Sequence, residues 1–122
     1  APKMVVPKDP FISFRDEVKN PAYVFVEICD TTAGQIDYTV ANGWTKLDNV
    51  TGKNHGVVYA YNTKVVGNQI EDLPILNGNT VTVKETATAT NLSGATLTFY
   101  GYLCQATGFE TAAAAFDACF GK

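Results

Sequence analysis

The sequence predicts an all-β fold, an antiparallel β-sandwich or jelly roll with one short C-terminal α-helix, in a single domain over residues 1–122. Short apolar runs recur along the chain, and Asn, Gly or Pro residues separate them. Residues 80–84 alternate, with valines on one side and Thr or Lys on the other, as a half-buried strand does. An alanine-rich stretch at the end has helical spacing instead. A partly open barrel is the alternative arrangement of the same strands.

The chain is expected to start with an extended segment over residues 1–10, a possible donor strand, which ends in the rigid motif Pro7-Lys8-Asp9-Pro10. The clearest strand covers residues 22–29. Alternate residues point to two faces: Val24, Val26 and Ile28 to one, and Tyr23, Phe25 and Glu27 to the other. Because Glu27 carries a charge, we expect the second face to lie partly in solvent.

Further strands are predicted over residues 11–14, 35–41, 44–47, 57–61 and 95–105. Asn42-Gly43 is predicted to join two of them in a tight hairpin, because Asn-Gly supplies the positive φ angles of such turns. Residues 49–56 are predicted to form a polar loop and residues 62–76 a long crossing. Asn77-Gly78 and residues 91–94 are predicted turns.

The C-terminal helix is predicted over residues 110–120, with Thr111 as its N-cap and Gly121 at its end. One apolar stripe follows its length: Ala112, Ala115, Phe116, Cys119 and Phe120.

Three cysteines, Cys29, Cys104 and Cys119, allow one disulfide and leave one thiol over. Their spacing does not match a zinc site. One interpretation is that all three are buried free thiols that act as small hydrophobic residues. If one bridge forms, we expect Cys104–Cys119, because the helix folds back beside the strand that it leaves.

Composition narrows the class of protein. The net charge is −3 and the nine basic residues are scattered along the chain, so we expect no nucleic-acid partner. No apolar run approaches the roughly 18 residues of a transmembrane helix, so no transmembrane segment is predicted. The chain starts with Ala and contains an internal Met, which we interpret as a processed product and which permits secretion.

The sequence contains few candidate residues for catalysis or metal binding. His55 is the single histidine and lies in a polar loop, which does not favour a triad or a HExxH-type metal site. The acidic groups, Asp9 with Asp16 and Glu17, and Glu71 with Asp72, follow no calcium-loop pattern and are interpreted as solvated charges. We therefore expect no enzyme activity, no catalytic residue, no bound metal and no cofactor.

Two tyrosine pairs are candidates for a ligand-binding face. Tyr59 and Tyr61 share one side of a predicted strand, and Tyr100 and Tyr102 share one side of another. Such rows can bind a sugar or cover the second face of a sandwich. An extracellular module that binds carbohydrate or a host surface is therefore the alternative function.

Several segments occur in an order that resembles a known family. They are Val6-Pro7-Lys8-Asp9-Pro10, Pro21-Ala22-Tyr23-Val24-Phe25-Val26, Gly43-Trp44, Val58-Tyr59-Ala60-Tyr61, Thr80-Val81-Thr82-Val83, Tyr102-Leu103-Cys104-Gln105-Ala106-Thr107-Gly108-Phe109 and residues 111–116. This order is similar to that of the TasA/camelysin family, secreted proteins whose signal peptides are removed by a dedicated peptidase. The resemblance covers nearly the whole chain. Three cysteines, and only residues 1–6 before the Pro7-Lys8-Asp9-Pro10 motif, depart from the family pattern.

The resemblance implies a secreted, extracellular jelly-roll protein of the cell surface or of biofilm-matrix fibres. In fibre-forming members, an N-terminal strand of one subunit completes the sheet of the next. Carried over, Met4, Val5 and Val6 would be the donor or edge strand, and the partner would be a second copy in a homo-oligomer or filament. Metalloprotease activity has been described for some members, but this sequence lacks a ligand set for it.

Overall fold

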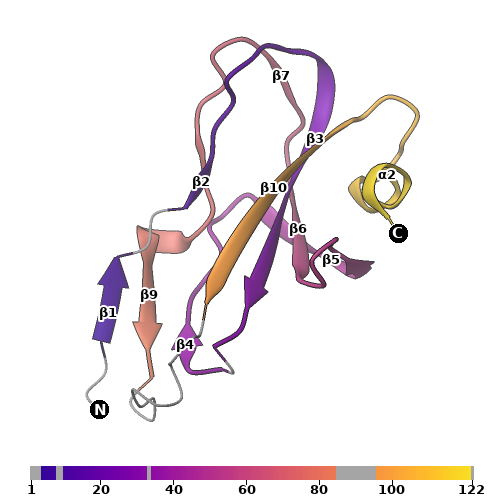
Figure 1. Cartoon of the computed structure of the whole chain (residues 1–122). Coiled ribbons are helices and arrows are strands. Elements are labelled where there is room, and N and C mark those ends of the chain that lie inside the picture. Colours follow the sequence, from indigo (N-terminus) through magenta and orange to yellow (C-terminus); the bar gives the residue numbers. More distant parts are fainter. Residues whose placement is uncertain (1–3, 8–9, 33, 85–95, 122) are drawn as a thin grey trace.

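The computed structural model of the chain describes residues 4–7, 10–32, 34–84 and 96–121 (Figure 1). These residues form antiparallel strands and one α-helix, α2 (Ala112–Phe120), so the all-β prediction is confirmed. The strands are β1 (Met4–Pro7), β2 (Phe11–Ile12), β3 (Val18–Asp30), β4 (Ile36–Asp37), β5 (Trp44–Thr51), β6 (Val57–Tyr61), β7 (Val65–Gly67), β8 (Leu73–Pro74), β9 (Thr80–Val83) and β10 (Leu97–Gln105). A 3-10 turn, η1 (Asn77–Asn79), leads into β9.

The largest sheet has five strands in the order β10-β3-β6-β5, and β7 pairs with the first part of β3. Strand β3 is its centre, since it pairs with β10 along one side and with β6 and β7 along the other. Its middle section, residues 22–28, is buried throughout. The β-branched and aromatic residues of this section suit a strand that is covered on both faces.

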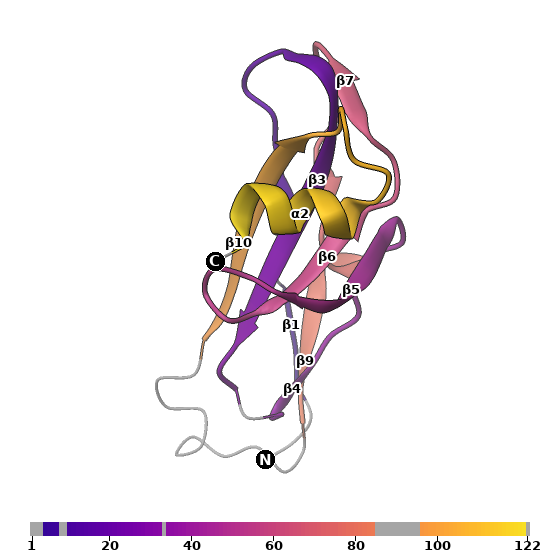
Figure 2. The same cartoon turned by 90° about the vertical axis from the view of Figure 1, so that its right-hand side faces the viewer.

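Two smaller sheets lie on one side of the five-stranded sheet, and α2 lies on the other (Figure 1). The smaller sheets have the orders β1-β9-β4 and β2-β8. In the turned view, α2 crosses in front of β10, β3 and β6 (Figure 2). Strand β3 therefore separates two packed layers.

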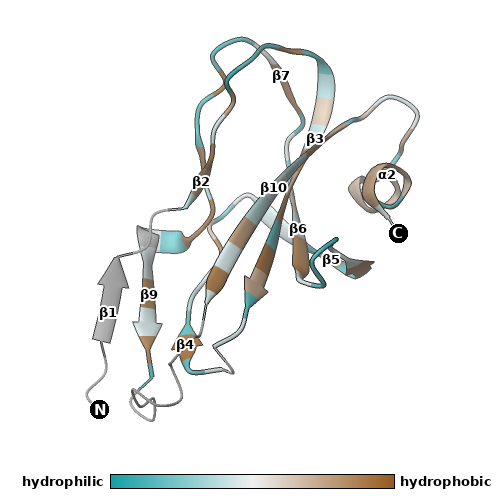
Figure 3. Cartoon of the chain, viewed as in Figure 1, coloured by the Kyte–Doolittle hydropathy of each residue, from teal (hydrophilic) through white to brown (hydrophobic). Residues whose placement is uncertain are grey.

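Each face of β3 belongs to its own hydrophobic cluster. On the side of the small sheets, Val24, Val26 and Ile28 pack with buried residues of the segments that include β8 and β9: Leu73, Ile75, Leu76 and Val81. On the helix side, Tyr23 and Phe25 pack with Ala115 and Phe116 of α2. Figure 3 shows hydrophobic stretches in brown on β3, β6 and α2.

The prediction of a partly solvated second face of β3 is wrong. Glu27 has an exposed fraction of 0%. The reason is that α2 and residues 52–56 cover the face that Glu27 shares with Phe25.

The predicted hairpin at Asn42-Gly43 is also wrong. The turn forms, with a φ of 103° at Gly43, but it carries the chain from one sheet to another. Ile36 pairs with Val83 of β9, whereas Trp44 pairs with Tyr61 of β6. Pairing with strands distant in the sequence, rather than the local turn, therefore determines which sheet each of these two segments joins.

Strand lengths differ from the predictions at further places: β2 ends at Ile12, β3 is longer at both ends, and the predicted crossing at residues 62–76 contains β7 and β8. Strand β5 continues to Thr51, into the expected polar loop, because Thr51 pairs with Val57 after a shift of register. Residues 35–41 form only the short β4 and an isolated bridge from Val40 to Leu76. The predicted turn at residues 91–94 lies outside the described residues.

Candidate functional site

The N-terminal segment predicted to act in assembly forms β1 at the edge of a small sheet. It pairs antiparallel with β9 of the same chain, from Met4 opposite Val83 to Pro7 opposite Thr80. Within the described part of the chain, β1 pairs with β9 along one edge, and no strand pairs with the other edge of β1. Met4, Val5 and Val6 thus lie at a sheet edge and are held by one short ladder.

A second edge is open along β10. Among the described residues, this nine-residue strand pairs with β3 alone. A strand with one unpaired side presents a row of backbone N–H and C=O groups to any further strand. Among the described residues, the long outer edge of β10 is therefore unpaired.

A cleft of about 660 Å³ lies beside this edge, between residues 11–20 and the inner face of β10. Leu103 and Gly101 face it, because they stand opposite Val24 and Val26 on the core side of β3. Leu103 is 46% exposed and Phe11, on the other wall, is 50% exposed. The chain here leaves apolar side chains uncovered at the open side between β2 and β10.

The four candidate tyrosines do not form one surface. Tyr59 stands opposite Val26, so Tyr59 and Tyr61 face the small sheets, where Tyr61 packs edge-on against Trp44. Tyr102 stands opposite Phe25, so it and Tyr100 face the helix side. Tyr100 alone of the four is exposed, at 39%. A sugar-binding platform that uses both pairs is therefore not favoured by their placement.

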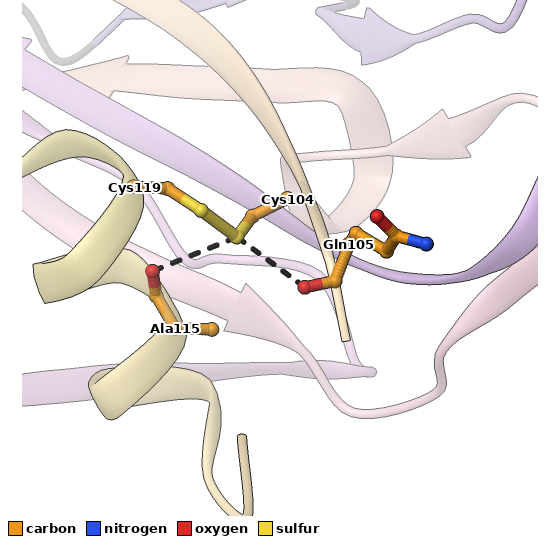
Figure 4. Close-up of a disulfide and its surroundings, with 4 residues drawn as sticks. All are labelled: Cys104, Gln105, Ala115 and Cys119. Carbon is orange, nitrogen blue, oxygen red and sulfur yellow. Dashed lines mark hydrogen bonds between the residues drawn. A yellow bond between two sulfur atoms is a disulfide. The ribbon is translucent and has the colours of Figure 1, made fainter. Parts of the chain in front are cut away.

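The structure joins Cys104 of β10 to Cys119 of α2 in a disulfide, the pairing expected from the sequence if a bridge forms. Figure 4 shows Cys104 Sγ between two carbonyl oxygens, 3.5 Å from that of Gln105 and 3.6 Å from that of Ala115. In the disulfide these are sulfur–oxygen contacts, since the sulfur carries no proton. Cys29 is free and half-buried.

A polar site that sequence reasoning missed surrounds Glu27. Its Oε2 accepts hydrogen bonds from the backbone N–H groups of Asn54 (3.0 Å) and Gly56 (2.7 Å). Its Oε1 accepts from the Asn54 side-chain amide (3.3 Å) and from the Tyr102 hydroxyl. The Cys29 thiol lies 3.5 Å from Oε2. The one signal in the sequence was a charged residue within the most hydrophobic strand.

Glycines let the loop approach this carboxylate. A Cβ atom at Gly52 would overlap the Glu27 carboxyl group, and one at Gly56 would lie 2.7 Å from Cys29 Sγ. Side chains at these positions would therefore separate the loop from the acid. His55 lies between Asn54 and Gly56, which bind Glu27, but its own side chain is exposed. The backbone of His55 has a positive φ of 64°.

These contacts set the protonation states of Glu27, Tyr102 and Cys29. Burial alone would raise the pKa of Glu27, but the hydrogen bonds from Tyr102, Gly56, Asn54 and Cys29 outweigh it and lower that pKa below its ordinary value. Burial and the bond to Glu27 raise the pKa of Tyr102 to about 12, and burial with the same carboxylate raises the pKa of the Cys29 thiol. At neutral pH a charged Glu27 is thus held by protonated donors, and the arrangement anchors the loop.

Neither a metal cluster nor a membrane span is found in the described ranges. No three His, Cys, Asp or Glu side chains within residues 4–7, 10–32, 34–84 and 96–121 are grouped as a metal site would require. No helix among these residues is long and apolar enough to cross a bilayer.

The chain matches no family model, no curated protein and no solved structure. The resemblance of its sequence motifs to the TasA/camelysin family therefore remains a hypothesis.

Proposed function

We propose that this chain is a secreted, non-enzymatic structural subunit that assembles into an extracellular fibre or surface matrix by strand addition. In this proposal its sheets form an incomplete jelly roll, and a strand from a neighbouring copy completes it. The observation that carries the proposal is the open edge of β10 beside a cleft whose walls expose Phe11 and Leu103.

The donor in this proposal is the segment Met4–Val6. It belongs to a short edge strand that four residue pairs hold on β9, so it can exchange one ladder for another. Addition to β10 of the next copy would pair that edge and cover the cleft walls. Because each copy would donate and accept once in the same direction, the contact propagates as a filament.

The disulfide supports the secreted location. Disulfides persist in oxidising compartments and are rare in the reducing cytosol. Cys104 and Cys119 are paired in this fold. An extracellular setting suits such a pair.

The test combines a deletion with an edge substitution. Removing residues 1–6 should leave a folded monomer that forms no filaments, as seen by negative-stain electron microscopy and size-exclusion chromatography. Leu103→Lys, which places a charge in the cleft, should also block assembly. Val66→Lys is the matched control, because Val66 is 53% exposed on β7 and does not line the cleft. Filaments from the deleted chain would refute strand donation by this segment.

A further inference from the structure

Helix α2 is docked on the sheet along one side. Of its nine residues, only Ala115 and Phe116 are buried. Isolated helices of this length are unstable in water, so α2 needs its docking surface to remain helical. The Thr111 hydroxyl, which accepts from the Ala114 N–H at 3.1 Å, caps its start without attaching it to the sheet.

The disulfide supplies the covalent attachment. It closes a loop over a sequence separation of 15 residues, between the edge strand and the last turn of the helix. Cys104 is 3% exposed, whereas Cys119 is exposed to solvent. A dithiol can therefore reach the bond from the helix side. The carbonyl oxygens of Gln105 and Ala115 next to Cys104 Sγ could accept its proton after reduction.

A continuous set of contacts leads from α2 to the Glu27 site. The rings of Phe116 and Phe120 pack on the ring of Tyr102, with centroids 5.1 and 4.9 Å apart. The Tyr102 hydroxyl donates to Glu27, and Glu27 holds the loop through Asn54 and Gly56. The same loop and carboxylate contact the thiol of Cys29, which lies 3.7 Å from the Asn54 carbonyl oxygen.

We propose that the Cys104–Cys119 disulfide is a redox latch: it holds α2 over the Glu27 site, and its reduction by a dithiol frees the helix and makes Cys29 reactive. Without the helix, the ring of Tyr102 loses its cover and its hydroxyl no longer stays on Glu27. The loop at residues 52–56 then opens and uncovers the thiol. The third cysteine thus reports the state of the other two.

The redox step balances as a thiol–disulfide exchange. A thiolate of the dithiol attacks Cys119 Sγ and forms a mixed disulfide, and Cys104 leaves as a thiolate that takes up a proton. The second thiolate of the dithiol then attacks the first sulfur of the same dithiol, which is bonded to Cys119 Sγ in the mixed disulfide. Cys119 leaves as a thiolate and takes up a proton. Two electrons pass to the protein, and the dithiol becomes a cyclic disulfide.

The experiment compares the oxidised protein with the double variant Cys104→Ala/Cys119→Ala, since Cys29 is the only thiol in both. Amide hydrogen exchange of residues 112–120 should be at least about tenfold faster in the variant, while residues 22–28 stay protected. Alkylation of Cys29 by N-ethylmaleimide should accelerate to a similar extent. The wild-type chain reduced with dithiothreitol should show the same exchange pattern in α2.

Tyr102→Phe is the matched variant, because it keeps the disulfide and the ring packing but lacks the hydroxyl. It should accelerate alkylation of Cys29 and leave α2 protected. Unchanged exchange in α2 without the disulfide would overturn the latch, and so would loss of protection in β3 together with α2, which would make the bond a staple of the whole fold. Unchanged alkylation of Cys29 in either variant would overturn the transmission through Tyr102.

Discussion

Replacing Glu27 with Gln is expected to lower the free energy of unfolding by about 2–3 kcal/mol at neutral pH. The amide oxygen of Gln can still accept from the two backbone N–H groups of Asn54 and Gly56. Its NH₂ group, however, faces the Asn54 side-chain amide, which is also a donor, so that bond is lost. The remaining bonds lose the charge that strengthens them, since bonds to charged groups contribute about 1.5–3 kcal/mol and neutral ones about 1 kcal/mol.

Urea unfolding of Glu27→Gln and the wild type at about pH 7 and about pH 3 measures this effect. The pKa of Glu27 is lowered from 4.5 in the folded chain, so its stabilisation is complete above pH 4.5 and is lost as the pH falls through the folded value. The wild type should therefore lose stability in acid, and the difference between the two proteins should narrow.

The control for this experiment is Glu17→Gln, because Glu17 is an exposed carboxylate. It should change stability by no more than about 0.5 kcal/mol. A Glu27→Gln effect equally small at neutral pH, or one of the same size at both pH values, would refute the assignment of Glu27 as a charged anchor.

Three further substitutions probe the packing around β3 and are measured by urea unfolding. Gly52→Ala should lower the free energy of unfolding by at least about 2 kcal/mol, because its Cβ would overlap the carboxyl group of Glu27, which hydrogen bonds hold in place. Gly101→Ala should lower it by less than about 1 kcal/mol, because its Cβ meets only the flexible end of the Ile12 side chain. Equal costs would contradict the close approach of the loop. Phe116→Ala should cost about 3–5 kcal/mol, because this ring is fully buried against Phe25, and a loss below about 1 kcal/mol would show that α2 does not cover the core.

Local features of this protein could be predicted from the sequence. The alternation of residues 23–28 between two faces, the Thr111 cap of α2 and the positive φ at Gly43 each depend on residues within a few positions of one another. Side-chain periodicity and backbone preference act over that range, so strand and helix positions follow from spacing.

The candidate site depended on contacts that spacing does not encode. The donors that hold the buried Glu27 carboxylate come from distant parts of the chain. Gly56 lies 29 residues after Glu27, and Tyr102 lies 75 residues after it. The Asn42-Gly43 turn forms with a positive φ at Gly43 and none at Asn42, and pairing with β9 and β6 places the strands beside it in different sheets. The side of the sheet on which each of the four tyrosines lies follows from the register of β6 and β10 on β3. The sequence by itself determined where the main strands and the helix lie, through interactions between near neighbours. Only the tertiary structure decided which faces were covered, because burial depends on which distant segments pack together.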